Sequence, residues 1–166
     1  AIHDIRSALD GAVLSLETLR SRTLVEAVTE GRVDFAIVRE DALPKGARRH
    51  PVRQIRFHLC VPRKRLKRGT HPGAVDDPKE WQSLPFTAGK DGGQLDSAIR
   101  DAMRDAGVNF RPQVLCNSML QARQLIERGE YAGNLPSVGI HGLDPKQIII
   151  RDFAPLKNYG RHLVLH

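Results

Sequence analysis

The sequence has few cysteines, few aromatic residues and no long apolar run. Its 166 residues include 2 cysteines, and aromatic residues make up 5%. Cys60 and Cys116 are too few for a disulfide scaffold and suit reduced thiols in the cytosol. No apolar stretch reaches the roughly 18 residues that a membrane span needs, and the first residues lack the pattern of a secretion signal. We therefore expect a cytoplasmic location and no membrane partner.

The composition is otherwise that of a globular protein with an excess of positive charge. Hydrophobic residues make up 40% and charged residues 27%, which excludes disorder and collagen. Lysine and arginine number 26 against 19 acidic residues, a net charge of +7, and this favours anionic partners. The basic run at residues 63–68 has no interleaved aromatic residues and no recognition helix beside it. We therefore expect a solvated connector there rather than a nucleic-acid site.

The N-terminal third of the chain predicts a strand–helix–strand unit, with strands at residues 12–16 and 33–37. Between them, Thr23 and Glu26 match the capping box that begins a helix, and Gly31 suits the left-handed residue that ends one. In the second strand, Val33, Phe35 and Ile37 alternate with Asp34 and Ala36. The two strands should be parallel, joined by a right-handed crossover.

The rest of the chain continues this alternation of strands and helices. One helix is expected at residues 95–106, closed by Gly107, and another from a capping box at Ser118 and Gln121 to Gly129. Loops are expected at residues 42–51 and 89–94, and further strands at residues 54–60, 84–88, 113–116, 131–135, 147–151 and 161–165. Repeated βα units predict an α/β architecture of two lobes.

Three polar loops stand where a ligand would bind in such an architecture. They are residues 19–23, 87–94 and 117–118. In α/β sheets, ligands bind at the carboxyl ends of strands, where loops lead into helix N-termini. If the lobes face one another, all three loops open into one cleft, and the free N–H groups of the helices suit an anion.

The motifs resemble those of LysR-type transcriptional regulators. Residues 24–38 match the family's signature of a helix, a glycine and a strand carrying an aspartate, with Gly31 and Asp34 in place. Further stretches in the family's order are residues 84–86, 117–129 and 131–136. The resemblance implies a two-lobe type II periplasmic-binding-protein-like fold, with two strands crossing between the lobes. It also implies that the chain senses an effector for a transcriptional regulator.

The same resemblance implies how the chain divides. One lobe would comprise residues 1–60 plus 138–166, and the other residues 61–137. The family's winged helix-turn-helix, first strand and final helix are not in this sequence, and residues 2–9 look like the end of a helix stopped by Gly11. We therefore expect a chain trimmed at both ends, with DNA bound only through the missing N-terminal domain. A homodimer or higher homo-oligomer is expected.

The resemblance also implies a set of effector-binding residues. Ser21 would supply a hydroxyl, and the guanidinium of Arg39 could hold a carboxylate through two parallel hydrogen bonds. The full set expected to bind a small anionic effector is Ser21, Arg22, Thr23, Arg39, Thr87, Lys90, Asn117, Ser118 and Pro136. The hydroxyl residues at helix starts could instead be caps only. Arg39 could pair with Glu40 or Asp41 on the surface, and Lys90 could be a solvated loop lysine.

Nothing in the sequence points to catalysis, a metal or a cofactor. His58 and Cys60 form a pair without further zinc-ligand spacing, and no G-x-S-x-G motif occurs. Cys116 follows a strand beside the expected cleft, so a thiol sensor is conceivable, although a buried unreactive thiol is favoured. Two alternatives on the same fold stay open, namely a solute-binding protein of a transporter and a non-regulatory enzyme.

Overall fold

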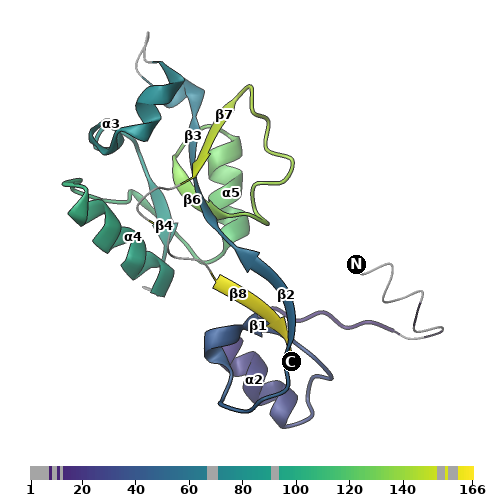
Figure 1. The fold of residues 1–166 in the computed structure, drawn as a ribbon. Helices are drawn as coiled ribbons and strands as arrows, with labels where there is room; N and C mark the ends of the chain where they lie inside the picture. Colours follow the sequence, from purple (N-terminus) through teal and green to yellow (C-terminus); the bar gives the residue numbers. More distant parts are fainter. Residues whose placement is uncertain are drawn as a thin grey trace. The chain divides into compact units, whose positions relative to one another are not determined.

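The computed structural model describes residues 8, 11, 13–66, 71–90, 94–152, 156 and 161–166. The chain forms two compact units (Figure 1). The first unit is Ala1–Val52 with Leu163–His166, and the second unit is Arg53–His162. These bounds differ from those expected for the lobes, because residues 53–60 and 138–162, expected in the first lobe, belong to the second unit. The physical reason is strand pairing: β7 (Ile148–Asp152) pairs along its whole length with β3 (Phe57–Pro62).

The first unit packs one helix against a three-stranded sheet. The helix is α2 (Ser21–Thr29), and the sheet has the order β1 (Ile37–Arg39), β8 (Arg161–Leu165) and β2 (His50–Ile55). A short 3-10 helix, η1 (Glu40–Ala42), follows β1 directly. β1 and β8 are antiparallel, with Val38 opposite Val164. The core of this unit consists of Val25, Ala36, Val38 and Val164.

The strand expected at residues 12–16 is not present in the part of that stretch that the structure describes. Residues 13–20 have no regular secondary structure, and Val13 and Leu16 are 96% and 72% exposed. The expected parallel pairing with the next strand is therefore wrong. An apolar run forms a strand only where a neighbouring strand accepts its backbone hydrogen bonds, and in the described structure β1 pairs with β8 instead.

The second expected strand is displaced and buries the face that carries Ala36 and Val38. β1 begins at Ile37 rather than at residue 33, and Phe35 and Ile37 are exposed while Ala36 and Val38 are buried. The larger apolar residues Val33, Phe35 and Ile37 therefore do not form the buried face. Alternation alone predicts two faces but not which of them meets the core. Here α2 and β8 pack on the Ala36 and Val38 face.

Helix α2 begins earlier than its sequence signal indicated. Its first residue is Ser21, and no side chain caps its N-terminus, so the Thr23–Glu26 capping box is wrong. Its end is as predicted. Gly31 has φ 70°, and the N–H groups of Gly31 and Arg32 donate to the carbonyls of Val28 and Ala27, which is a Schellman motif. Of the helix expected at residues 2–9, all but Ala8 lies outside the described residues.

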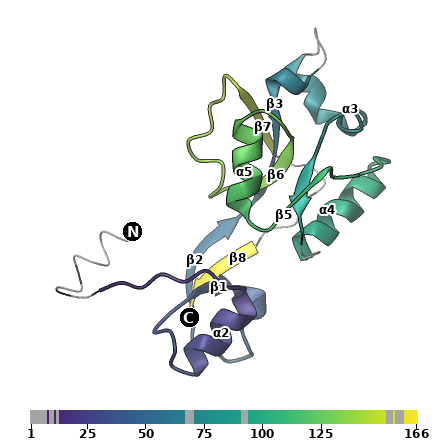
Figure 2. The ribbon, with the colours of Figure 1, turned by 180° about the vertical axis from the view of Figure 1, so that it is seen from behind.

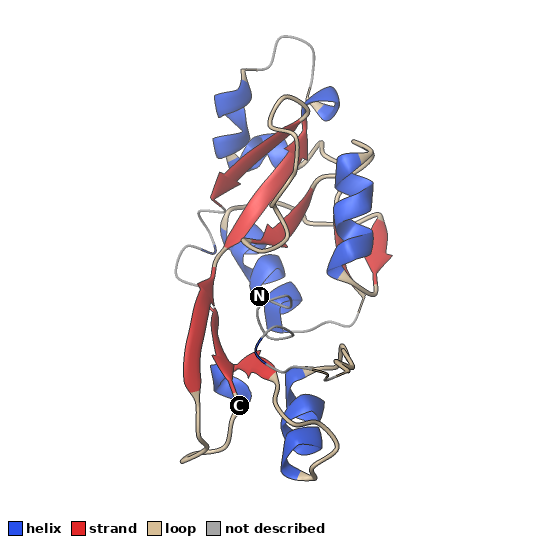
Figure 3. Ribbon diagram, turned by 90° about the vertical axis from the view of Figure 1, so that its right-hand side faces the viewer, coloured by secondary structure: helices blue, strands red, loops and turns tan. Residues whose placement is uncertain are grey.

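The second unit is a mixed sheet between helices (Figure 3). β6 (Gly133–Pro136), β3 and β7 are antiparallel in that order, and β4 (Thr87–Gly89) and β5 (Val114–Cys116) are parallel. A parallel bridge between Phe86 and Ala132 joins the two groups of strands. The α-helices are α3 (Pro78–Trp81), α4 (Gln94–Asp105) and α5 (Met119–Glu127), and the 3-10 helices are η2 (Arg63–Arg65) and η3 (Pro72–Asp76).

Both faces of β3 are covered, and its last four residues are buried. Leu59 and Val61 pack in one core with Met103 of α4. Cys60, which points the other way, packs with Ile126 of α5. Alternate side chains of a strand face opposite sides of the sheet, so helices on both sides bury successive residues.

The α4 and α5 segments follow their sequence signals. α4 connects β4 to β5 as a parallel strand–helix–strand unit (Figure 2). Gly107 closes it with φ 72°, and Val108 N–H donates to Met103 O at 2.8 Å. Ser118 is the N-cap of α5, and its hydroxyl accepts a hydrogen bond from Gln121 N–H. Gly129, with φ 70°, ends α5.

Candidate functional site

In the first unit, the start of α2 meets the end of β1. Ser21 is the first residue of α2, and its Oγ accepts a hydrogen bond from the backbone N–H of Arg39, the last residue of β1, at 3.3 Å. A hydroxyl can also donate one hydrogen bond, so the Ser21 hydroxyl can accept from Arg39 and donate to another group. Two of the residues singled out from the sequence are thus in direct contact.

The side chain of Arg39 has an acidic neighbour. Arg39 Nε lies 3.3 Å from Asp41 Oδ1, and the two side chains are 32% and 40% exposed. Surface pairing was one of the two interpretations of Arg39, and Asp41 is the partner. Glu40 is bound instead by Arg49, with 3.1 Å between Arg49 Nη1 and Glu40 Oε1. A half-exposed ion pair is weak, so an anionic ligand can compete with Asp41 for the guanidinium.

The other two residues of this loop take no part in that contact. Arg22 is exposed and Thr23 is half-buried, both within the first turn of α2. Neither caps the helix. The free N–H groups of this first turn carry the partial positive charge of the helix N-terminus, which favours an anion nearby.

In the second unit, the carboxyl ends of two parallel strands lie next to each other. Gly89 is opposite Cys116, and Lys90 N–H donates to Cys116 O at 2.9 Å. Lys90 and Asn117 therefore follow neighbouring strands at the same edge, and both are exposed. The loop then enters α5, where Asn117 N–H donates to Gln121 Oε1 at 2.9 Å. The Ser118 half of the predicted capping box is confirmed, whereas the Gln121 side chain accepts from Asn117 N–H rather than from Ser118 N–H.

Thr87 and Pro136 lie on the same group of strands but differ in exposure. Pro136 is the last residue of β6. Ala132, just before β6, is bridged in parallel to Phe86, just before β4, so the carboxyl end of β6 is at the same edge as Lys90. Thr87 is 3% exposed, and its hydroxyl lies 3.1 Å from Cys116 Sγ. The Thr87 hydroxyl is therefore a hydrogen-bond partner inside the unit rather than a group at its surface.

The nine candidate residues thus form two sets. Ser21, Arg22, Thr23 and Arg39 are in the first unit, and Thr87, Lys90, Asn117, Ser118 and Pro136 are in the second unit. Within the second unit, Lys90, Asn117, Ser118 and Pro136 share the carboxyl edge of β4, β5 and β6.

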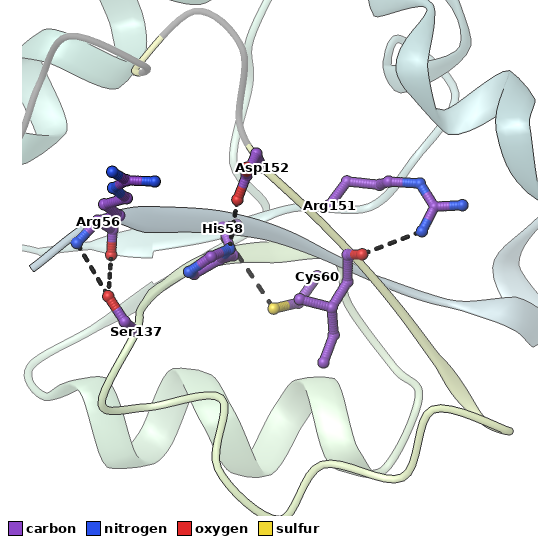
Figure 4. A network of polar contacts seen from close by, with 7 residues as sticks. Arg56, His58, Cys60, Ser137, Arg151 and Asp152 are labelled. Carbon is purple, nitrogen blue, oxygen red and sulfur yellow. Dashed lines mark hydrogen bonds and ion pairs between the residues drawn. The ribbon is translucent and has the colours of Figure 1, made fainter.

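A polar network on β3 was not found from the sequence (Figure 4). His58 Nδ1 lies 3.0 Å from Asp152 Oδ1, with side-chain exposures of 15% and 79%. Arg56 N–H donates to Ser137 Oγ at 2.9 Å, and the Ser137 hydroxyl donates to Arg56 O at 3.0 Å. These partners are more than 80 positions apart in the chain. The contact between His58 and Asp152 follows from the pairing of β3 with β7, which places the two residues opposite each other. It could have been predicted only if that pairing had been known.

The two cysteines are free. Burial raises the pKa of the Cys60 thiol to about 12, since a low-polarity environment disfavours the thiolate. This is the inert thiol that the sequence favoured at Cys60. Cys116 is 7% exposed and contacts Thr87.

The described residues contain no cluster of three or more histidine, cysteine, aspartate or glutamate side chains that could hold a metal ion. Among them, no helix has the length and apolar character to cross a membrane.

Polar side chains at the carboxyl ends of parallel strands, beside helix N-termini, are the arrangement in which α/β domains bind ligands. The particular family follows from the sequence: the model of the LysR substrate binding domain matches residues 1–166, and the chain belongs to this family. The family has the two-lobe periplasmic-binding-protein-like fold that the motifs implied, and this prediction is confirmed. No curated protein sequence matches the chain.

Solved structures of regulators share the fold. A reduced form of OxyR from N. meningitidis is 21% identical, with a TM-score of 0.66, and the match covers 99% of this chain and 75% of that one. The reduced regulatory domain of OxyR2 from Vibrio vulnificus is 17% identical, with a TM-score of 0.67, over 99% of this chain and 76% of that one. Full-length CbnR in complex with its target DNA is 14% identical, with a TM-score of 0.65. That match covers 99% of this chain but 56% of CbnR.

The family membership defines the class of function. The chain is an effector-sensing domain of a LysR-type transcriptional regulator, and the family and its structural neighbours are regulators rather than enzymes. The alternatives of a transporter solute-binding protein and a non-regulatory enzyme are not favoured.

Proposed function

We propose that the chain binds a small anionic effector through the nine candidate residues, and that binding changes how the complete regulator acts at DNA. The observation that carries this proposal is the contact between Ser21 and Arg39 at the N-terminus of α2. Ser21 brings a hydroxyl to the helix N-terminus, and Arg39, from whose backbone N–H it accepts a hydrogen bond, carries a guanidinium. A carboxylate is the group that these three donors recognise together.

The second unit supports the same ligand chemistry. Lys90 brings a cation, and Asn117 and Ser118 bring polar side chains at the start of α5. Each set by itself therefore offers polar partners to an anionic group. Thr87 contributes indirectly in this proposal, because its buried hydroxyl fixes Cys116 just before Asn117.

Sensing requires more than binding. An effector changes the behaviour of a regulator only if it binds two conformations of the protein with different affinity. We propose that the DNA-binding domain lies outside this chain, in the longer regulator, and that the regulator acts as a homodimer or higher homo-oligomer in the cytoplasm. We also propose that the ligand leaves the domain chemically unchanged.

A ligand screen with matched variants tests the site. The chain would be screened against small carboxylates by thermal shift, and the affinity of each ligand found would be measured by calorimetry. Arg39→Gln should weaken binding by about tenfold or more, since a charge-assisted hydrogen bond contributes about 1.5–3 kcal/mol. Arg49→Gln is the control, because it removes the same charge from a neighbouring ion pair.

The same screen tests the residues of the second unit and the proposal that the ligand is not chemically changed. Lys90→Gln should also weaken binding, while Lys79→Gln, an exposed lysine on α3, should not. If every ligand found binds the Arg39 and Arg49 variants equally well, the site assignment is wrong. Mass spectrometry of the ligand after incubation should show an unaltered compound, and its conversion would refute the proposal that the domain does not catalyse.

A further inference from the structure

A pocket of about 260 Å³ lies at the other end of the second unit from the candidate residues. Its walls are the end of β3, the 3-10 helix η2, the last turn of α5 and the turn that leads into β7. The strand register fixes its place. Pro62 is opposite Ile148 at the pocket end of β3, whereas Phe57 is opposite Pro136 at the end that carries the candidate residues.

The charged residues of this pocket are mostly cations. Arg63, Lys64, Arg128 and Lys146 line it together with one acid, Glu127. The four cations are exposed, and they come from three separate segments of the chain. Such a concentration of one sign in a concave surface raises the local potential and attracts anions.

Two acidic residues at the pocket already have partners within the protein. Glu127 Oε1 accepts hydrogen bonds from Nε and Nη2 of Arg123, at 3.0 and 2.8 Å. Asp144, just before the turn, accepts from Lys146 N–H at 2.8 Å and from Gln147 Nε2 at 3.1 Å. Arg123 thus offsets the charge of Glu127, and the four cations that line the pocket remain in excess.

Two of the cations are fixed in position by backbone carbonyls. Lys64 Nζ donates to Arg128 O at 2.6 Å, and Arg63 donates through Nε and Nη2 to Pro145 O, both at 3.3 Å. Next to them, Arg65 Nε donates to Gly129 O at 2.9 Å. The Lys64 and Arg65 bonds offset the partial negative charge at the C-terminus of α5, which would otherwise repel an anion.

We propose that this pocket binds a phosphate-bearing anion. Arginine and lysine together provide the forked and point-charge donors that phosphate oxygens accept. Four cations suit the multiple charge of a phosphoryl group better than the single charge of a carboxylate. Pockets for drug-sized ligands measure roughly 300–1,000 Å³, so this smaller volume suits one or two phosphoryl groups rather than a whole large ligand.

The basic run at residues 63–68 therefore has a use that the sequence did not indicate. It was expected to be a solvated connector, but Arg63, Lys64 and Arg65 each bind a carbonyl of another segment. Lys67 and Arg68 lie outside the described residues. The site is also separate from the candidate residues near Ser118, since the 9 residues of α5 span roughly 13 Å at 1.5 Å per residue.

Calorimetry and amide NMR with pyrophosphate as the probe test the proposal on the whole chain. Pyrophosphate should shift the backbone amide signals of Gly129 and Gln147. Arg128→Gln and Lys146→Gln should each weaken binding by about fivefold, which is less than for a buried pair because both side chains are exposed. Lys79→Gln removes the same charge on α3 and should change affinity by less than about twofold.

A second titration with a short DNA duplex distinguishes the source of the phosphate. If the pocket takes the nucleic-acid backbone, the duplex should shift the same amides and compete with pyrophosphate. If the pocket takes a free phosphate compound, pyrophosphate should shift the amide signals of Gly129 and Gln147 and the duplex should not. The proposal is overturned if neither probe shifts Gly129 and Gln147, or if Lys79→Gln weakens binding as much as the two pocket variants. Circular dichroism confirms that each variant is folded.

Discussion

The backbone N–H of Arg39 donates a hydrogen bond to the hydroxyl of Ser21 at 3.3 Å. These residues are 18 positions apart, and the bond ties the end of β1 to the first residue of α2. Ser21 therefore does more than begin a helix. It holds in place the strand end from which the Arg39 guanidinium projects.

Replacing Ser21 by alanine should affect both stability and ligand binding. The variant loses the acceptor for Arg39 N–H, and a partly buried hydrogen bond contributes about 1 kcal/mol. We expect a lower midpoint of urea denaturation and weaker binding of any carboxylate ligand found in the screen. Ser15→Ala, in the exposed segment before α2, should change neither. Equal midpoints and affinities for the two variants would contradict the role given to Ser21.

The parts of the fold that could be predicted are those encoded by neighbouring residues. Gly31, Gly107 and Gly129 end helices because a left-handed residue is needed there, and Ser118 begins one because its hydroxyl can reach Gln121 N–H. Strand pairing depends instead on distant segments. Nothing near residue 37 indicates that its strand pairs with β8, so the buried face of β1 and the absence of a strand at residues 13–16 could not be derived locally.

The same distinction applies to the candidate site. Lys90 and Asn117 were expected together because each follows a strand that leads into a helix, and the parallel pairing of β4 and β5 brings them together. The burial of Thr87 was missed, since its exposure depends on Cys116 of the neighbouring strand. The phosphate pocket was missed for a similar reason: its cations come from segments that are far apart in the sequence.

The two expected capping boxes should respond differently to mutation. Ser118→Ala removes a side-chain cap of α5 and should lower the free energy of unfolding by about 1 kcal/mol. Thr23→Ala removes no cap from α2 and should lower it by less than about 0.5 kcal/mol. Urea denaturation followed by circular dichroism measures both. A larger loss for Thr23→Ala than for Ser118→Ala would contradict the assignment of caps.

Two helix-ending glycines form a matched pair. Gly107 and Gly129 have φ 72° and 70°, a conformation that costs roughly 1–2 kcal/mol for alanine. A Cβ at Gly107 would meet open space, whereas one at Gly129 would collide with Lys64 Cε. We therefore expect Gly129→Ala to destabilise the chain more than Gly107→Ala, because Lys64 must also leave Arg128 O.

Removing the lysine checks this reason. In a Lys64→Ala background, Gly129→Ala should cost only as much as Gly107→Ala, since the two changes act on the same contact and should not be additive. Denaturation midpoints of the single and double variants give the coupling. Additive costs would mean that Lys64 does not cause the difference between the two glycines.

Cys60 should be protected from alkylation for as long as the chain is folded. Its pKa is about 12 against 9.0 for an ordinary thiol, so at pH 8 roughly one thiol in ten thousand is the reactive thiolate. Because the pKa is raised, the thiolate fraction increases about tenfold with each pH unit above 8. The stability due to the buried neutral thiol is lost as the pH rises from about 9, the pKa of the unfolded thiol, towards 12, the pKa of the folded one.

Alkylation tests this burial. In a Cys116→Ser variant, iodoacetamide at pH 8 should label Cys60 only in urea, as measured by mass spectrometry. A Cys60→Ser variant measures the labelling of Cys116 by itself. Rapid labelling of Cys60 without urea in the Cys116→Ser variant would show that the Cys60 thiol is not buried in solution.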